Sequence, residues 1–443
     1  MKLWQKDIAS LKEVETFTVG KDREMDLLLA PYDVLGSIAH VTMLATIGLL
    51  TNEEKDIIVK ELQAIYKQTQ DDSFKIGEGV EDIHSQIEFL LTASLGEMGK
   101  KIHSARSRND QVLVDIKLFL RSEIESLVNA IVPFFQLLQQ QSEAFKNHLF
   151  PGYTHLQLAM PSSFGLWFGA YAESLVDDMV TLQAAYKVAN KNPLGSAAGY
   201  GSSFPINRKL TTELLGFDNL NYNVVYAQMG RGKAERITAQ ALANVAETLA
   251  RLSMDMCLYL NQNFDFVSFP QELTTGSSIM PHKKNPDVFE LIRSHCNRIK
   301  ALPNEITMMT TNLPSGYHRD LQLLKEHLFP TFSTLKDCIS MAALMLSNIS
   351  VKQPILTDEK YKYIFSVEEV NKLVLQGIPF RDAYKQVGMA IEKNAFEYTI
   401  DIQHTHEGSI GNLCNEEINA MMEETFAMFG FQKVHSAIDK LVN

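Results

Sequence analysis

Residues 274–287 read TTGSSIMPHKKNPD, a stretch that holds serines, lysines and a histidine but little that would pack into a core. Gly276 permits backbone angles that are closed to other residues. Pro281 and Pro286 keep the chain between them out of a regular helix. Pro286 is also suited to the first position of a following helix, with Asn285 as its cap. We therefore expect a loop that ends at the N-terminus of a helix.

Positive charge gathers at the same place. The free N–H groups and the dipole of a helix N-terminus favour a negative group, and Lys283 and Lys284 add formal positive charge. With Ser277 and Ser278 at its start, the stretch predicts a site for a carboxylate or another oxyanion. The alternative is a solvated loop that carries a lysine pair.

The segment PGYTHLQ, residues 151–157, places Thr154 next to His155 after a Pro-Gly turn. A threonine can bind a carboxylate while the imidazole beside it transfers protons. We expect a helix to follow this pair. The alternative is a histidine with a structural role.

The segment ARSRNDQ, residues 105–111, comes just before a long helical pattern. Asn109 or Asp110 can cap that helix, which is a sufficient structural explanation for both. Arg106 and Arg108 are unfavourable neighbours for the positive end of a helix dipole. We therefore expect the two arginines to hold an anion or to pair with another subunit.

A fourth segment, SGYHRDLQLLKE at residues 315–326, contains Tyr317, Gln322 and Lys325. Taken one at a time, these residues are typical of the exposed surface of a helix. The segment predicts no chemistry by itself.

Long helices must position these segments. No proline occurs between Pro31 and Pro133 or between Pro205 and Pro270. Both windows repeat apolar residues every three or four positions, which indicates amphipathic helices. The repeating residues are Val112, Ile116, Phe119, Leu120, Ile124, Leu127, Val128 and Ile131 in the first window, and Ile237, Leu242, Val245, Leu249, Leu252, Met256 and Leu260 in the second. Alternating strand patterns are scarce, so we expect an all-α fold built around a long-helix bundle.

The pattern is interrupted twice, near residues 100–108 and near 348–360. These breaks predict three mainly helical domains. We expect an N-terminal domain at residues 1–105, a central long-helix bundle at 106–355 and a C-terminal domain at 356–443.

Composition narrows the class of protein. The 443 residues are 45% hydrophobic and 21% charged with a net charge of −12, which is ordinary for a globular protein and does not favour nucleic-acid binding. The four cysteines are far apart and form no CxxC pair, so we expect buried free thiols and no zinc site. The N-terminus lacks a secretory signal, and the longest apolar run, residues 38–50, is too short to span a bilayer. We expect a cytoplasmic protein without a membrane partner.

The four segments together resemble the argininosuccinate lyase family, a branch of the fumarase/aspartase superfamily. The resemblance rests on GSSxMPxKxNP, PGYTHLQ, SRNDQ and the Tyr…Gln…Lys spacing in a helical chain of this length. It runs from about residue 17 to the segment GSIGNL at 408–413. The GSS loop marks the superfamily, while SRNDQ and GYTHLQ mark this branch.

The resemblance implies cleavage of argininosuccinate to arginine and fumarate with no metal or cofactor. Such an elimination requires a base, positive charge at the substrate carboxylate and a proton for the leaving nitrogen. By similarity Ser277 is the base, and His155, paired with Glu290, is the candidate acid. The implied catalytic residues are Ser277, His155, Glu290 and Lys283. The implied substrate-binding residues are Arg108, Asn109, Thr154, Ser278, Asn285, Tyr317, Gln322 and Lys325.

The resemblance also implies a homotetramer. Long helices of the subunits join in one multi-helix core, and each active site draws its motifs from three chains. The separation of the motifs along this sequence agrees with such sharing.

Some positions depart from the family's usual pattern. His282 stands where these lyases usually carry Gln, and adenylosuccinate lyases often carry MPHKRNP, which makes that activity the runner-up. Residues 194–208, 227–236 and 17–24 also lack the usual motifs. A third alternative is a non-enzymatic structural relative, as some crystallins are, although the implied catalytic residues are intact.

Overall fold

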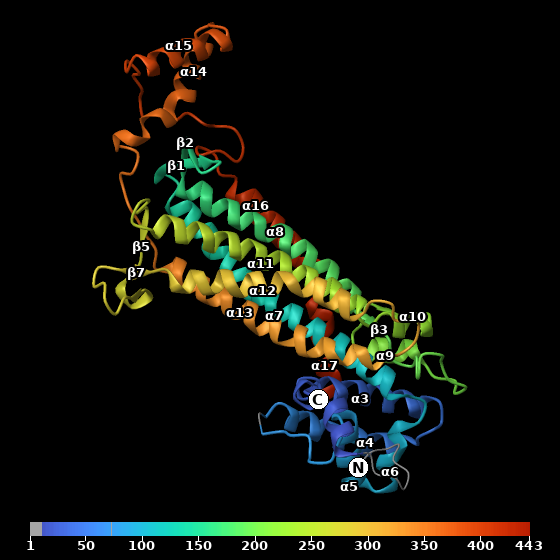
Figure 1. Cartoon of the computed structure of the whole chain (residues 1–443). Coiled ribbons are helices and arrows are strands. Elements are labelled where there is room, and N and C mark those ends of the chain that lie inside the picture. The colour runs from blue at the N-terminus through green and yellow to red at the C-terminus, as the bar shows by residue number, and fades with distance from the viewer. Residues whose placement is uncertain (1–10, 72) are drawn as a thin grey trace.

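The computed structural model describes residues 11–71 and 73–443, and helices dominate it (Figure 1). The N-terminal part is a group of short and medium helices at one end of the molecule. They are α1 (Lys12–Val19), α2 (Asp22–Leu27), α3 (Ala30–Thr46), α4 (Asn52–Thr69), α5 (Ile83–Leu95), α6 (Glu97–Lys100) and the 3-10 helix η1 (Lys101–His103).

Five long helices run side by side through the centre of the molecule (Figure 1). They are α7 (Arg108–Ala144), α8 (Phe164–Ala189), α11 (Lys233–Leu260), α12 (Asp287–Met309) and α13 (Leu324–Ser347). At 1.5 Å rise per residue, the 37 residues of α7 span about 55 Å. The two ends of the bundle are therefore far apart.

The apolar stripes of these helices form the core, as the periodicity predicts. On α7 and α11 the predicted residues from Ile116 to Ile131 and from Leu242 to Met256 are buried, while Val112, Ile237 and Leu260 at the helix ends are half-buried. Burying one Leu or Phe side chain stabilises a fold by roughly 1.5–3 kcal/mol. The bundle therefore follows from the sequence pattern.

Three prolines lie inside these helices and not at their ends. Pro133, Pro303 and Pro330 lie inside α7, α12 and α13. A proline removes one helical hydrogen bond and disfavours the helix. Buried side chains on both sides of Pro133, such as Ile131 and Phe135, hold α7 in place through it.

Two helix starts differ from the sequence prediction. Ser107 caps α7, and the Asp110 side chain accepts from the Ser107 N–H at 2.8 Å, so the cap is a capping box on Ser107 rather than Asn109. Helix α12 begins at Asp287, with Pro286 at the cap position and no side-chain cap. Asn285 lies in the preceding strand and does not cap the helix.

The strands of the described residues are short and pair two by two. The antiparallel hairpin of β1 (Leu149–Thr154) and β2 (Gln157–Ser163) is the longest pair. The other pairs are β3 (Lys191–Asn192) with β4 (Asn219–Leu220), β5 (Val267–Ser268) with β8 (Ser350–Val351), and β6 (Thr275–Gly276) with β7 (Lys284–Asn285). The predicted all-α class is confirmed.

Short elements complete the chain. They are α9 (Arg208–Leu214), α10 (Val224–Met229), η2 (Gln271–Leu273), η3 (Arg319–Leu323), η4 (Glu359–Phe365), α14 (Ser366–Leu375), α15 (Phe380–Glu392), α16 (Asn415–Ala427) and α17 (Phe431–Val442). Helices α14 and α15 share a small core of their own. Helix α16 returns along α8, and α17 packs on α3 (Figure 1).

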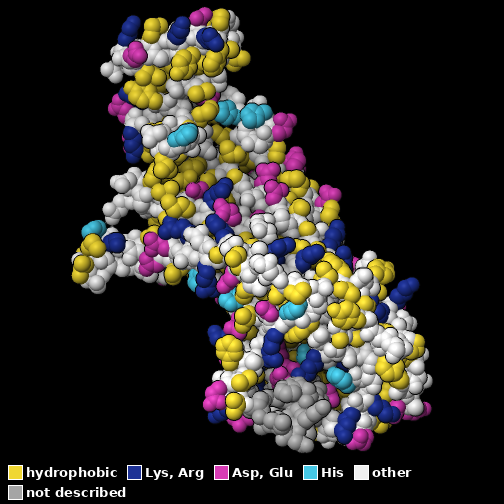
Figure 2. Space-filling model, turned by 45° about the vertical axis from the view of Figure 1, so that its right-hand side comes forward, with side chains coloured by type: hydrophobic (Ala, Val, Ile, Leu, Met, Phe, Trp, Pro, Cys, Tyr) yellow, Lys and Arg dark blue, Asp and Glu magenta, His cyan; other side chains and the backbone are white. Residues whose placement is uncertain are grey.

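The surface is mixed in charge. Figure 2 shows acidic and basic side chains interspersed over one face, with hydrophobic side chains gathered towards the end formed by α14 and α15. Leu375, Phe380 and Tyr384 are among the exposed apolar residues there.

Within residues 11–71 and 73–443, no helix combines the length and apolar character that crossing a bilayer requires. All four cysteines are free thiols. Cys296 and Cys338 are buried as expected, but Cys257 in the last turn of α11 and Cys414 directly before α16 are only half-buried, because both lie at the ends of their helices.

Candidate functional site

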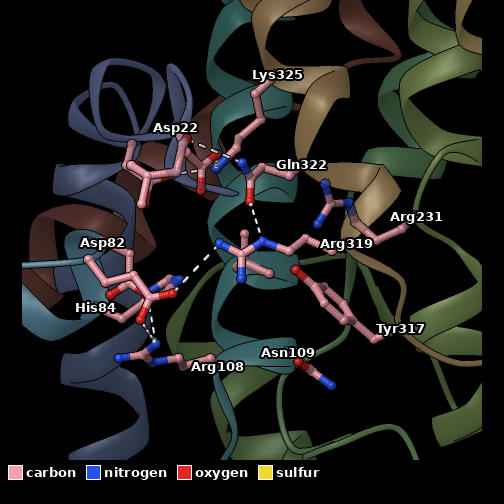
Figure 3. Close-up of a pocket in the computed structure, with 14 residues that line it drawn as sticks. Asp22, Asp82, His84, Arg108, Asn109, Arg231, Tyr317, Arg319, Gln322 and Lys325 are labelled. Atoms are coloured by element: carbon pink, nitrogen blue, oxygen red, sulfur yellow. Dashed lines mark hydrogen bonds and ion pairs between the residues drawn. The ribbon is translucent and has the colours of Figure 1, made fainter. Parts of the chain in front are cut away.

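A cavity of about 220 Å³ lies beside the start of α7 (Figure 3). Its walls come from parts of the chain far apart in sequence: α2, the start of α5, the start of α7 and the segment around η3. The lining residues are Val19, Asp22, Asp26, Glu81, Asp82, His84, Arg108, Asn109, Val112, Arg231, Tyr317, Arg319, Gln322 and Lys325. We refer to it as the Arg108 pocket.

Two guanidinium groups face the acidic wall of this pocket. Arg108 Nη1 lies 3.2 Å from a carboxylate oxygen of Glu81 and 3.1 Å from one of Asp82, and Arg108 Nη2 donates to Ser85 Oγ at 2.5 Å. Arg319 lies 3.7 Å from Glu81 and donates to Gln322 at 3.2 Å. Figure 3 shows both groups directed at the acids. The wall thus presents carboxylates and cations within reach of one small ligand.

Lys325 closes the pocket from α13. It is buried and makes ion pairs with Asp22 and Asp26 of α2. Burial alone would lower the pKa of Lys325, but the two carboxylates raise it overall, so the ammonium is charged. Burial, together with the charge of Asp26, raises the pKa of Asp22 to about 6. The charge of this wall therefore changes just below neutral pH.

Asn109 and Tyr317 complete the pocket with neutral polar groups. Figure 3 shows the Tyr317 hydroxyl pointing towards the middle of the cavity. Among the described residues, neither side chain has a hydrogen-bond partner within the protein. Both are free to bind a ligand.

Several residues of this pocket were not predicted from the sequence. They are Asp22, Asp26, Glu81, Asp82, His84, Arg231 and Arg319. The signal available in the sequence was the pair of adjacent acids Glu81 and Asp82 directly before α5. In the structure Asp82 caps this helix and accepts from Ser85 N at 2.8 Å. Arg231 belongs to residues 227–236, which lack the motifs usual in the family. Its side chain donates to Glu235 at 2.8 Å and to the Leu321 carbonyl at 2.7 Å.

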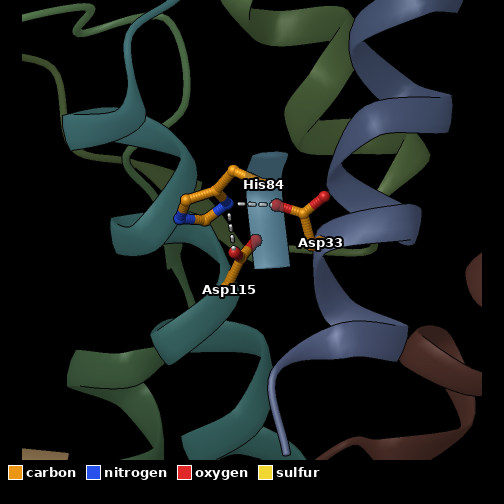
Figure 4. Close-up of side chains that lie close together, drawn as sticks. All are labelled: Asp33, His84 and Asp115. Carbon is orange, nitrogen blue, oxygen red and sulfur yellow. Dashed lines mark hydrogen bonds and ion pairs between the residues drawn. The ribbon is translucent and has the colours of Figure 1, made fainter. Parts of the chain in front are cut away.

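Behind the pocket lies a buried cluster of Asp33, His84 and Asp115 (Figure 4). His84 Nδ1 is hydrogen-bonded to Asp33 and lies 3.5 Å from Asp115. Burial alone would lower the pKa of His84, but Asp33 raises it overall. Burial and the neighbouring Asp33 raise the pKa of Asp115 well above its usual range.

This is the one group among the described residues whose ligand types and spacing could hold a metal ion. A proton on His84 Nδ1 occupies the lone pair that a metal would require. Arg106 is half-buried in the same region and donates to Ser37 at 3.0 Å, and the charges of Asp33, Asp110 and Asp115 act on its guanidinium. The printed partner of Arg106 thus lies in its own chain, and its pairing with an anion or with another subunit stays a prediction.

The Ser277 loop lies elsewhere. The short β6–β7 ladder holds the two ends of the loop together, so its polar residues project from the molecule. Ser277 is half-buried, and its Oγ accepts from the N–H groups of Ile279 at 3.4 Å and Met280 at 3.1 Å. Ser278 and Lys283 are exposed.

The other two predicted residues of this region flank the loop. Asn285 is half-buried in β7, and Glu290 is exposed on the first turn of α12. The loop therefore leads into a helix N-terminus, as the sequence predicts.

Thr154 and His155 occupy the tip of the β1–β2 hairpin and are exposed. His155 and Leu156 have φ angles of 54° and 57°, the left-handed conformation of a tight two-residue hairpin turn. The predicted helix directly after this pair is wrong, because β2 follows and α8 starts only at Phe164. No Gly or Asn at the turn marked the hairpin in the sequence.

The predicted residues thus fall into three places. Arg108, Asn109, Tyr317, Gln322 and Lys325 meet in the Arg108 pocket. The Ser277 loop and the His155 hairpin lie at the opposite end of the long helices (Figure 1). Within the described chain no hydrogen bond or ion pair joins His155 to Glu290. One chain alone does not bring the twelve residues together.

Comparisons with known proteins agree with the family resemblance of the sequence motifs. Residues 7–301 match the protein family described as lyase. An argininosuccinate lyase of Bacteroides fragilis is 62% identical over 436 residues, which is 98% of each chain. One of Parabacteroides distasonis is 60% identical over 442 residues, 100% of this chain and 99% of its own. Among solved structures, a variant of EDDS lyase with bound fumarate matches with a TM-score of 0.76 and 20% identity, covering 98% of this chain and 95% of its own, which shows the fold.

Proposed function

Because the chain belongs to the argininosuccinate lyase family, we propose that it cleaves argininosuccinate to arginine and fumarate. The observation that carries this beyond the family match is the composition of the Arg108 pocket. Argininosuccinate bears carboxylates, an ammonium and a guanidinium. A cavity that offers Glu81 and Asp82 beside Arg319 and Lys325 has a partner for each of these charges.

The reaction is a β-elimination that side chains can carry out. A base removes the proton from the carbon next to a carboxylate, the electrons of that C–H bond form the new C=C bond, and the C–N bond breaks. The leaving guanidinium nitrogen takes up a proton. No redox step or cofactor enters this balance, and we propose that none is required.

We propose Ser277 as the base. A serine hydroxyl is a poor base unless its oxyanion is stabilised. Ser277 Oγ already accepts from two backbone N–H groups, which is the arrangement that stabilises an alkoxide. Lys283, Ser278 and Asn285 follow in the same loop and would bind the substrate carboxylate.

We propose that His155, supported by Glu290, is the acid that protonates the leaving nitrogen. We propose that Thr154 binds a carboxylate of the substrate. A carboxylate beside an imidazole raises the histidine pKa and fixes its tautomer. Both His155 and Glu290 are exposed, so a second copy of the chain can bring them together.

The length of the helices supports the proposal that chains share their active sites. The Arg108 pocket and the Ser277 loop lie at opposite ends of a bundle whose longest helix spans about 55 Å. When two copies pack their bundles antiparallel, the pocket end of one copy meets the loop end of the other. We propose a homotetramer in which each active site uses three chains.

We also propose a cytoplasmic location.

We further propose that the chain divides into three domains, at residues 1–105, 106–355 and 356–443. Residues 1–10 and 72 of the first domain lie outside the described residues. The long helices all fall within 108–347, and α14 and α15 have their own core, which supports the division. Helices α16 and α17 pack on α8 and α3 instead, so limited proteolysis with mass analysis of the fragments is the appropriate test.

The function is tested by mixing the purified protein with argininosuccinate and following the ultraviolet absorbance of fumarate. Absence of fumarate would rule the proposal out. His282 favours adenylosuccinate as the second candidate substrate, so the same assay is run with adenylosuccinate alone and in competition. A clear preference for adenylosuccinate would replace the first proposal by the second.

A further inference from the structure

A second cavity of about 220 Å³ adjoins the Arg108 pocket on the other side of Arg231. Arg231 lines both cavities, and Figure 3 shows it at the edge of the first one beside Tyr317. The second cavity is formed by the α10–α11 junction and the loop that leads to η3. Its lining residues are Gln228, Met229, Arg231, Gly232, Lys233, Arg236, Thr310, Leu313, Pro314, Ser315, Gly316, His318 and Leu321. We call it the Arg236 cavity.

The Arg236 cavity is positively charged. Three cationic side chains and His318 line it, and no Asp or Glu is among the lining residues. The Arg108 pocket next to it has four acids in its lining. Glu235 balances the charge of Arg231, so Lys233 and Arg236 carry the positive charge that this cavity leaves unpaired in a chain with a net charge of −12.

Two of the cations are available to a ligand. Arg231 is buried and is already bound to Glu235 and to the Leu321 carbonyl. Lys233 is exposed and lies 5.2 Å from the centre of the Tyr226 ring. Arg236 is exposed and has no hydrogen bond or ion pair with any residue that the structure describes.

The backbone adds to the positive charge. Helix α11 has 28 residues, begins at Lys233 and has no side-chain cap. Gly232 has a φ of 75°, and a Cβ there would lie 2.7 Å from Thr310 Cγ2, so the uncapped end is held close against the loop. Cations beside the positive end of a helix dipole repel it. Glu235 in the first turn offsets part of this repulsion but is directed at Arg231. The Ala234 N–H donates to the Gly230 carbonyl at 3.1 Å, so an anion in the cavity would accept from the N–H groups of this turn that have no such partner.

We propose that the Arg236 cavity is a subsite for a small oxyanion, a carboxylate or a phosphate, bound by Lys233, Arg236 and the first turn of α11. Its volume of about 220 Å³ leaves room for such a group. The oxyanion has two possible sources. One is a carboxylate of the substrate that reaches past Arg231, which rests on the proposed function, and the other is a free anion such as inorganic phosphate.

The test uses the full-length, assembled protein. Wild type, Arg236→Gln and the double variant Lys233→Gln/Arg236→Gln are titrated with inorganic phosphate in a calorimeter. Both positions are exposed, so the fold is expected to survive, and a melting curve checks this. Arg381→Gln is the matched control, because Arg381 is an exposed arginine on α15 at the other end of the molecule. Kinetics with argininosuccinate are measured with and without phosphate.

For a free anion we expect the double variant to bind phosphate about tenfold more weakly or worse, since charge-assisted hydrogen bonds are lost, while KM stays unchanged. For a substrate carboxylate we expect competitive inhibition by phosphate in the wild type, and a rise in KM of about tenfold in the double variant with kcat preserved. Arg381→Gln should match the wild type throughout. If the double variant keeps both the phosphate affinity and the KM of the wild type, the proposal is overturned. If no fumarate is ever formed, the calorimetric result still decides for or against the cavity.

Discussion

The imidazole of His84 on α5 is hydrogen-bonded to the carboxylate of Asp33 on α3, with Asp115 of α7 3.5 Å from the same nitrogen (Figure 4). All three side chains are buried. The contact joins the N-terminal helices to the bundle directly behind the Arg108 pocket. His84 follows Asp82 and precedes Ser85, which both bind Arg108, so this contact helps to fix two walls of the pocket relative to each other.

This cluster predicts how stability depends on pH. The folded-state pKa of His84 is raised, so its contribution is full below the unfolded pKa of about 6.5 and is lost as pH rises through the folded value. The raised pKa of Asp115 acts in the same direction, because the folded state holds a proton that the unfolded state releases. We expect the free energy of unfolding to fall as pH rises above the unfolded carboxyl value of about 3.9 for Asp115, and above about 6.5 for His84, by about 1.4 kcal/mol for each unit by which a pKa is raised.

The variant His84→Asn should make this slope shallower, whatever it does to the stability at one pH. Denaturant titrations at several pH values measure it. His295→Asn is the control, since His295 is exposed on α12. An unchanged slope in His84→Asn would show that the cluster does not carry the pH dependence.

Replacement Ser277→Ala should lower kcat by about 10²–10⁴, the usual contribution of a positioned base. The melting temperature should hardly move, because Ser277 lies half-buried in a projecting loop. The fumarate absorbance assay measures the effect, and Ser436→Ala, an exposed serine on α17, serves as the control. Turnover of Ser277→Ala equal to the wild type would remove Ser277 from its role.

Mixed assemblies test whether active sites are shared. Ser277→Ala and Arg108→Ala chains are each expected to be nearly inactive alone. After unfolding and refolding together in equal amounts, roughly a quarter of wild-type activity should return, because that share of random pairings joins an intact pocket to an intact serine. A mixture that stays as inactive as its parts would mean that pocket and serine come from the same chain.

Substitution Arg108→Lys should raise KM about tenfold with a smaller effect on kcat. The planar guanidinium reaches Glu81, Asp82 and Ser85 at once, which a single ammonium cannot do. Loss of one charge-assisted hydrogen bond costs about 1.5–3 kcal/mol. Steady-state kinetics decide this, with Arg381→Lys as the matched control. An unchanged KM would show that the geometry of Arg108 is not needed for substrate binding.

Local pattern was enough to predict much of this molecule. The apolar repeat from Val112 to Ile131 predicts a long helix, and the structure contains it, since a 3.6-residue period can be buried only in that conformation. The glycine and prolines around Ser277 predict a non-helical loop that runs into a helix, and α12 follows it. The motif residues, and the family that they resemble, can also be identified from the sequence alone.

The positions of the site residues relative to one another could not be predicted in this way. Nothing near Arg108 in the sequence indicates that Glu81, Arg319 and Lys325 surround it, because these contacts depend on how whole helices pack and not on neighbouring residues. The turn at His155 and the passage of α7 through Pro133 were likewise decided by tertiary packing, which outweighs weak local preferences. The sequence determined which groups can do the chemistry. Only the fold decided that the pocket lies at one end of a rigid bundle and the serine loop at the other, since a bundle whose longest helix spans about 55 Å cannot bend to bring its ends together.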